Sequence, residues 1–574
     1  MKRTTRMAVA LCAVLVLLVT ACGSSGGEKA SSTTKAGDTG GTDTPKASDN
    51  DMNPTPRDQV KQGGTLNWAL TGPVVNYNPN ELDGASVDSY AVLTALLPSP
   101  FIVDAEAGLH TDPNYVVSAE VTSSSPKQVV TYKLNPKAVW DDGKPVNEKD
   151  YEASWKSQSG EDADYKIAAS NGYDQIESVE QGKDQFEVIV TFAKPYADWK
   201  GLFSLMIPAA SSNDPKIFNE GWIDKPLASA GPFITGGTDQ TAKTITLIPN
   251  PKWWGNKPKL DKIIFRAIDI DAQVDALANG EIDFIDIGPD VDTLKRAQAT
   301  KGIEIRRAAG PNFRHVTING TGPILKDLEV RRALALTINR DAIGKALLGP
   351  LGVDPTPLNN HIYMTNQVGY QDNAGEFSKS DPKKAAEILD ADGWKQEGSG
   401  TRTKDGKKLS LRIVIPSQVA TSQKESELMQ GMLEQVGIKL KIDVVPGDDF
   451  FDKYITPGDF DLTVFSWFGT PFPVSSSKSI YVNPVEGKDG LDIQQNYARI
   501  GSPELDKLFD ESGTEFDSDK LIKIANEIDA DIWKEVHSLT LYQRPDIAGA
   551  KATLANYGAQ GFQTVKYEDI GFTA

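Results

Sequence analysis

Apolar and polar residues alternate in several short runs of the first half of the chain. The runs at 63–70, 129–150, 186–195, 244–255 and 262–271 contain the period of two that is typical of strands with one buried face. An Asp-Asp-Gly turn interrupts the second run, and Asn147 or Asp150 is then placed to cap a helix at "YEASWKS". This half is therefore predicted to be rich in strands.

The second half changes to alternating strands and helices. "LSLRIVIP" (409–416) predicts a strand, and "IKLKIDVV" (438–445) predicts another. Between them, Ser422 and Glu425 have the spacing of a capping box, and apolar residues then follow one helical face up to Gly437. A strand, a helix of four turns and a second strand predict a crossover unit of a mostly parallel sheet.

The segment 326–349 has the strongest helical pattern in the chain. Asp327 is placed to cap a first helix and Asp341 a second one. Arg331 and Arg332 could bind an anion, but so many acidic residues surround them that structural ion pairs are the better interpretation.

The stretch "DLTVFSWFGTPFP" (461–473) begins as a strand and then breaks. Trp467, Phe468 and Phe472 stand on a backbone interrupted by Gly469 and two prolines. These aromatics either pack a core or form a wall that faces a ligand. Their position at the carboxyl end of a strand, where open sheets bind ligands, favours the wall for Trp467.

The first residues predict export rather than part of the fold. A basic start and an apolar run of signal-peptide length end in "VTAC", which resembles the lipobox of bacterial lipoproteins. Residues 1–21 are then a signal peptide and Cys22 is lipidated. Because the other cysteine, Cys12, lies inside the signal, the mature chain has no disulfide. Residues 22–62 have almost no apolar side chains and predict a disordered tether.

Composition narrows the classes of function. A chain of 574 residues predicts several folding units, and a net charge of -19 argues against nucleic acid and broad adsorption to anionic lipid. The four histidines are scattered, and we find no motif for a metal or cofactor. Glu281, Asp283 and Asp286 cluster in "ALANGEIDFIDIG", where a strand pattern favours structural use. Carboxylates are so numerous that a secreted hydrolase stays open as an alternative.

Several segments together resemble the family-5 extracellular solute-binding proteins of ABC importers, which include peptide binders. The resemblance spans about residues 62–545 and rests on the order of its motifs, which are "GGTLN", "NPKAVWDDGKPVNEKDYEASW", "AGPFI", "NPKWWGNKPKLDKIIF", "ALANGEID", "EVRRALALTINRDAI", "DPKKAAEILDADGW" and "MLEQVGIKL". It implies an α/β, two-lobed periplasmic-binding-protein-like fold of class II, the large peptide-binder type, with an extra subdomain in the first lobe.

The resemblance also implies how the chain is divided. Lobe I is expected at 63–105 and 229–315, the inserted subdomain at 106–228, lobe II at 316–540, and a return to lobe I at 541–574. The implied function is capture of a solute, with a peptide as the expected ligand, between the lobes and its delivery to ABC permease and ATPase subunits. No reaction, cofactor or metal is implied, and we expect a monomer on the outer face of the cytoplasmic membrane, attached through its lipid anchor only.

Candidate ligand-binding residues follow from the same resemblance. Peptide binders pair a backbone segment of lobe I with the ligand as an added strand, and "ELDGA" matches it at Asp83, Gly84 and Ala85. The second wall matches at Trp467, Phe468, Gly469 and Thr470.

Thr470 departs from the family pattern. Peptide binders usually have an aspartate there for the ligand's α-ammonium, and Val419 stands where dipeptide binders tend to have an arginine for the carboxylate. We therefore hypothesise either a longer peptide whose terminus is bound elsewhere, or a solute without a free amine. A solute sensor for a signalling partner is a further alternative to the importer role.

Overall fold

The computed structural model describes residues 50–574 apart from 171, 355 and 488–489. The expected signal peptide, Cys22 and most of the expected tether lie outside the described residues. Within the described part of the chain, no helix is long and apolar enough to cross a membrane.

The first lobe is built on a four-stranded sheet with the order β1-β10-β9-β8. The alternation in the sequence is realised, because Leu66 in β1 and Phe265 in β10 have no solvent-accessible surface. The C-terminal segment returns to this lobe, where Leu554 and Ile570 join the same core. Elements of this lobe are β1 (Thr65–Leu70), α1 (Val87–Leu93), β2 (Phe101–Val103), β3 (Leu109–Thr111), β8 (Phe233–Asp239), β9 (Thr244–Pro249), β10 (Lys262–Ala267), β21 (Leu554–Ala555) and β22 (Gly571–Phe572).

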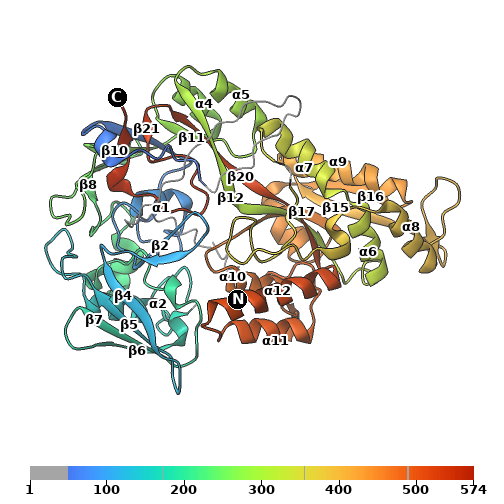
Figure 1. The fold of residues 1–574 in the computed structure, drawn as a ribbon, viewed down its shortest axis with the longest axis horizontal. Coiled ribbons are helices and arrows are strands. Elements are labelled where there is room, and N and C mark those ends of the chain that lie inside the picture. Colours follow the sequence, from blue (N-terminus) through green and yellow to red (C-terminus); the bar gives the residue numbers. More distant parts are fainter. Residues whose placement is uncertain (1–49, 171, 355, 488–489) are drawn as a thin grey trace, which may run out of the picture.

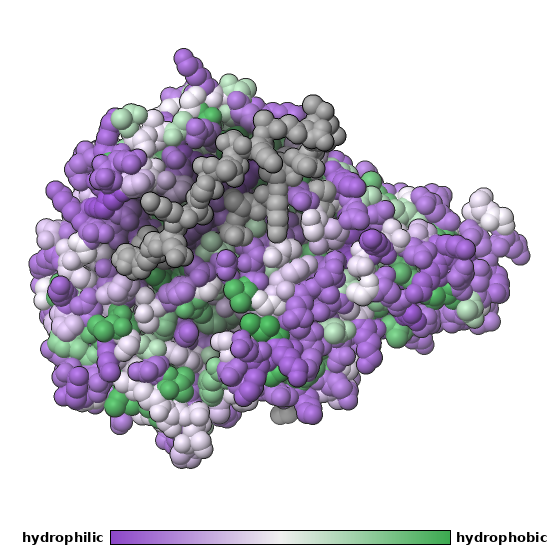
Figure 2. Space-filling view, in the orientation of Figure 1, coloured by the Kyte–Doolittle hydropathy of each residue, from purple (hydrophilic) through white to green (hydrophobic). Residues whose placement is uncertain are grey.

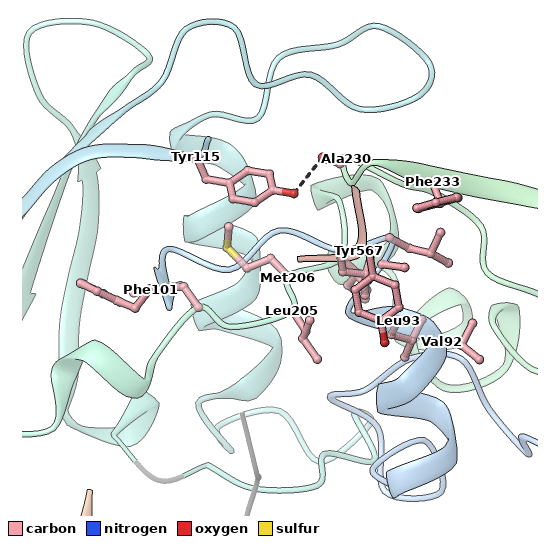
Figure 3. Packing of buried hydrophobic residues seen from close by; sticks show 14 of the residues in the cluster. Val92, Leu93, Phe101, Tyr115, Leu205, Met206, Ala230, Phe233 and Tyr567 are labelled. Carbon is pink, nitrogen blue, oxygen red and sulfur yellow. Dashed lines mark hydrogen bonds between the residues drawn. The ribbon is translucent and has the colours of Figure 1, made fainter. Parts of the chain in front are cut away.

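A second four-stranded sheet, β4-β5-β7-β6, forms a subdomain beside the first lobe (Figure 1). Asn147 begins its helix in a capping box with Asp150, so both residues named from the sequence take part in the cap. Figure 3 shows the core shared with the first lobe, where the Tyr115 hydroxyl donates to the Ala230 carbonyl at 3.0 Å. The elements are β4 (Val116–Ser123), β5 (Val129–Leu134), α2 (Glu148–Gln158), β6 (Ile176–Gln181), β7 (Glu187–Phe192) and α3 (Ala209–Ser212).

The second lobe contains a six-stranded sheet with the order β11-β20-β12-β17-β15-β16. The predicted crossover unit is confirmed, because β15 and β16 are parallel and α9 joins them. The strands are β11 (Phe284–Asp286), β12 (Ile303–Ile318), β15 (Ser410–Pro416), β16 (Lys439–Val445), β17 (Leu462–Phe468) and β20 (Ser538–Lys551). Helices α4 (Ile270–Ala278), α5 (Val291–Ala299), α6 (Leu328–Thr337), α7 (Arg340–Leu348), α8 (Pro382–Ala391), α9 (Ala420–Gln435), α10 (Pro473–Tyr481), α11 (Pro503–Ser512) and α12 (Ser518–Glu535) complete this half of the chain.

Two long antiparallel strands, β12 and β20, connect the lobes (Figure 1). Ala550 at one end of β20 packs in the core of the first lobe, whereas Leu541 near the other end packs in the core of the second. Their pairing shifts register between Ala309 and Phe313. A bulge of this kind bends a strand, so it lets one pair of strands serve both lobes.

The starts of three helices test the expected caps. Asp327 caps α6, as predicted. The cap predicted at Asp341 is wrong, because the cap lies two residues earlier, where Asn339 accepts from the Ala342 amide. The capping box at Ser422 and Glu425 is also wrong, since α9 begins at Ala420 without a side-chain cap.

Ser422 and Glu425 instead bind the guanidinium group of Arg314 beneath α9. Arg314 of β12 donates through Nε to Glu425 Oε1 at 3.0 Å, through Nη2 to the other carboxylate oxygen, and to Ser422 Oγ at 2.9 Å. The Tyr542 hydroxyl donates to Glu425 Oε1 at 2.7 Å. Glu425 has no accessible surface and Arg314 is 5% exposed, so this is a buried and fully hydrogen-bonded ion pair. Arg331 and Arg332 have structural partners as well, namely backbone carbonyls for Arg331 and Glu329 and Glu376 for Arg332.

The first lobe encloses a cavity of about 70 Å³ lined by Asp112, Lys566, Glu568 and neighbouring residues. Burial raises the pKa of Glu568 to about 7 and that of Asp112 to about 6. Both values exceed the ordinary carboxyl pKa of roughly 4 of an unfolded chain. The native state therefore binds more protons than the unfolded state between these values, and its stability falls as the pH rises from about 4 to about 7.

We accordingly expect Glu568→Gln to raise the free energy of unfolding at pH 8, by about 1 to 3 kcal/mol, and to change it little at pH 4.5. Thermal unfolding at the two pH values measures this. Glu106→Gln, at an exposed glutamate of the β2–β3 loop, is the matched control. A Glu568→Gln protein with the wild-type pH profile would contradict the prediction.

Candidate ligand-binding site

The aromatic stretch marks the join between a strand and a helix. β17 ends at Phe468, and Pro473 occupies the first turn of α10, where its missing amide costs nothing. The Gly469 amide donates to the Pro311 carbonyl at 2.5 Å, and a Cβ on Gly469 would lie 2.6 Å from Met364 Cε. The glycine is thus needed for close approach of this turn to its neighbours.

Trp467 is half-buried in a group of rings. Its ring stacks on Tyr497 with centroids 6.0 Å apart and on His315 at 5.7 Å, and it meets the edge of Phe465 at 5.1 Å. These residues adjoin a cavity of about 10 Å³, which has room for a single water molecule. Burial holds the pKa of His315 well below its usual range, so this histidine is neutral. Phe465 is 8% exposed and belongs to the core.

Phe468 points to the other face of β17 and is 53% exposed. Val419 is 39% exposed between β15 and α9, and Phe451 is 36% exposed six residues after β16. The ring of Phe451 meets that of Phe465 at 5.4 Å, so Phe451 lies on the face of β17 opposite Phe468. Phe468 therefore offers an exposed apolar side chain at the carboxyl end of β17, the edge where open α/β sheets bind ligands. The face of the molecule seen in Figure 2 is largely hydrophilic.

Thr470 is only 4% exposed, and the hydrogen bonds of its side chain are local. Its Oγ1 accepts from the Phe472 amide at 3.0 Å and donates to Ser476 Oγ at 3.1 Å. Its carbonyl accepts from Gln367 Nε2 at 2.9 Å. The hydroxyl therefore orders the start of α10.

Asp83, Gly84 and Ala85 form a tight turn before α1. Glu81, which is buried, accepts from the Asp83 amide at 2.8 Å and from the Gly84 amide at 3.2 Å through Oε2. The Ala85 amide donates to the Glu81 carbonyl at 3.2 Å. The three amides are thus bonded within the turn, while Leu82 and Val87 beside them are 52% and 86% exposed.

The subdomain touches the second lobe next to the aromatic stretch. The Ala197 amide donates to the Gly513 carbonyl at 3.1 Å, and a Cβ on Gly201 would lie 3.1 Å from the ring of Phe472. Asp198 lies between Ala197 and Gly201 in the chain. Burial raises its pKa to about 6, and a hydrogen bond with Ser475 reduces the size of this increase. The subdomain and the second lobe are therefore in direct contact at this point.

This contact predicts the effect of a larger side chain at Gly201. Leucine there has no room beside Phe472, so it should disfavour closure and weaken capture of the co-purifying ligand about tenfold or more, without lowering the melting temperature. Titration calorimetry measures the affinity, and Gly349→Leu, where a Cβ meets nothing within 4 Å, is the control. Equal affinities of the two variants would contradict the role of this contact in closure.

Among residues 50–574, outside the undescribed positions, no three histidine, cysteine or acidic side chains converge as metal ligands would. The described residues form two halves that are joined by crossing strands and touch each other. This architecture is typical of solute-binding proteins.

Comparison with known proteins identifies the family. The model for bacterial extracellular solute-binding proteins, family 5 Middle, matches residues 113–488, and the chain belongs to this family. Oligopeptide-binding protein OppA of Mycobacterium tuberculosis is 39% identical over 526 residues, which cover 91% of this chain and 87% of that protein.

Solved structures agree on the fold. The periplasmic EDTA-binding protein EppA has a TM-score of 0.79 at 26% identity and covers 92% of this chain and 98% of its own. The oligopeptide-binding protein AppA from Bacillus subtilis, in complex with a nonapeptide, has a TM-score of 0.67 at 21% identity and covers 90% of this chain and 100% of its own. Because such related folds hold a chelator and a peptide, the fold does not decide the ligand.

Proposed function

We propose that this protein captures peptides between its two lobes and delivers them to the permease and ATPase subunits of an ABC importer. The observation that supports this most is the 39% identity to oligopeptide-binding protein OppA over nine tenths of this chain. In this proposal the protein catalyses no reaction, acts as a monomer, and is held at the outer face of the membrane by a lipidated Cys22.

In the same proposal, Trp467, Phe468 and Gly469 form the wall of the second lobe. Phe468 offers the larger exposed apolar surface, and Trp467, on the opposite face of the strand, packs on Tyr497. Asp83, Gly84 and Ala85 form the opposing wall. Their amides are bonded within the turn, and the Gly84 carbonyl already accepts from the Ser86 amide, so a ligand strand would meet the carbonyls of Asp83 and Ala85 there. Thr470 positions the turn through its hydroxyl, which is hydrogen-bonded to the Phe472 amide and to Ser476 Oγ.

The test is to purify the full chain from its host, unfold it and identify the released ligand by mass spectrometry. We expect a family of peptides with varied sequences, since main-chain recognition tolerates different side chains. Recovery of a metal chelate or an oligosaccharide in stoichiometric amount, with no peptide, would overturn the proposal. Turnover of the recovered ligand into products would favour the hydrolase alternative.

A further inference from the structure

Three charged side chains lie on one face of the six-stranded sheet. Asp286 ends β11, while Arg544 and Asp546 stand two residues apart in β20. Because Asp286 pairs with Ala548, the alternation of a strand puts all three on the same face. Arg544 Nη1 also reaches Ser466 Oγ of β17 at 3.4 Å, which places the group beside the exposed Phe468.

These groups are open to solvent and yet surrounded by protein. Asp286 is exposed, and Arg544 and Asp546 are partly exposed. Nevertheless, burial and then the charge of Asp286 raise the pKa of Asp546 to about 7, and burial raises the pKa of Asp286. Burial also lowers the pKa of Arg544. A ligand can therefore reach these side chains, while the surrounding protein leaves little water to compete for their charges.

Each carboxylate is oriented by the backbone through one of its oxygens. Asp546 Oδ2 accepts from the amides of Gln560 at 2.8 Å and Gly561 at 3.0 Å, and Asp286 Oδ1 accepts from the Gly288 amide at 2.9 Å. The second oxygen of each is left for another donor. Arg544 has five N–H donors but only one long hydrogen bond, and no described carboxylate lies within ion-pair distance of it.

We propose that Asp286 and Asp546, named here the acidic pair, bind the primary ammonium group of a peptide ligand, and that Arg544 donates to the carbonyl oxygen of the same ligand residue. This inference rests on the proposed function and names the chemical group of the ligand that this face of the sheet would recognise. An ammonium group has three donors and relieves the repulsion between two carboxylates that the backbone holds together. It also supplies the counter-charge that Thr470 lacks.

The neighbouring titratable groups either bind one another or stay uncharged. Arg314 on β12, Glu425 on α9 and Tyr542 on β20 bind one another. Tyr557, which faces the acidic pair from the C-terminal segment, stays protonated because burial raises its pKa well above the usual value. Arg544 and the acidic pair are therefore the groups on this face that can respond to a ligand.

Proton release should accompany binding. Near neutral pH the free acidic pair retains part of a proton, and the incoming ammonium group favours full ionisation, so up to about one proton leaves per ligand bound. Affinity should then rise from pH 6 to about 7.5 and fall above about 8, where the amino terminus of the peptide loses its own proton.

The experiment uses the full chain and random pentapeptide libraries as probes. One library has free amino termini, one is N-acetylated without lysine, and one is N-acetylated with lysine. Captured peptides are counted by mass spectrometry after the protein is unfolded. We expect about tenfold or greater preference for the free library over the acetylated, lysine-free one. Capture of the third library would show that a lysine ammonium also enters the subsite, whereas its rejection would restrict the subsite to the amino terminus.

Asp286→Asn and Asp546→Asn should abolish this preference, because an amide can still accept from the backbone but carries no charge. Asp405→Asn, at an exposed hairpin turn, is the matched control and should keep it. The melting temperature of Asp546→Asn at pH 8 should equal or exceed that of the wild type, since ionising this carboxyl is costly in the folded state. Equal capture of free and acetylated libraries by the wild type, or an unchanged preference in both variants, would overturn the subsite alone. Failure to capture any peptide would overturn the proposed function as well.

Discussion

Replacing Glu425 by glutamine is expected to lower the free energy of unfolding by about 3 to 5 kcal/mol, which is a large part of the stability of an ordinary domain. Burial alone would lower the pKa of Arg314, but the charge and hydrogen bonds of Glu425 outweigh it. Without that carboxylate, a buried guanidinium is left uncompensated beneath α9. Urea unfolding followed by circular dichroism measures the loss.

Two further variants separate this ion pair from general damage to the helix. Glu434→Gln, on the exposed face of α9, should change the free energy of unfolding by less than about 0.5 kcal/mol. Arg314→Met combined with Glu425→Met should recover most of the loss, because apolar side chains of similar volume often replace a buried pair without cost. If Glu425→Gln were as stable as Glu434→Gln, the charge pair would not stabilise this lobe.

Replacing Trp467 by alanine should weaken binding of the co-purified ligand by about 30-fold or more, which corresponds to the 2 kcal/mol typical of an aromatic hot spot. Trp467 precedes Phe468 in β17 and its ring packs on Tyr497 and Phe465, so its removal should loosen the strand end that carries Phe468. Because Trp467 also stacks on Tyr497 and His315, some loss of stability accompanies the change. Calorimetric titration and thermal unfolding of the same preparation give both quantities.

Phe468→Ala separates the contribution of the aromatic stretch to ligand binding from its contribution to folding stability. Phe468 is 53% exposed, so its removal should leave the melting temperature of the ligand-free protein nearly unchanged while still reducing affinity. A Trp467→Ala protein that is destabilised but binds its ligand normally would restore core packing as the explanation for the aromatic stretch.

Local patterns in the sequence determined many of the elements. Alternation located β1, β9 and β10, and helical periodicity between two alternating strands located the crossover of β15, α9 and β16. Asp327 and Asn147 were found because a capping side chain acts on amides two or three residues away. Such signals depend only on near neighbours in the chain.

Contacts distant in sequence explain why the capping box at Ser422 and Glu425 was not formed. Ser422 and Glu425 have capping-box spacing, but their side chains bind Arg314, which is more than one hundred residues distant in sequence. Asp283 and Asp286 looked alike in one polar strand pattern, yet Asp283 is bound by Lys551 and Asn67 whereas Asp286 is open to solvent. Spacing along the chain predicts which residues share a face of a helix or strand. It does not predict which distant residues pack against that face in the folded protein.

The sequence by itself determined the net negative charge, the α/β class and the family, which the family match confirms. It also pointed to the aromatic stretch as a feature of interest, because glycine and prolines on a strand end can be recognised locally. Only the tertiary structure decided that Thr470 serves its own turn, that the subdomain meets Phe472, and that Asp286 lies beside Arg544 and Asp546. Those outcomes depend on contacts between segments far apart in the chain, which are set by the crossing of β12 and β20 and by the packing of whole lobes.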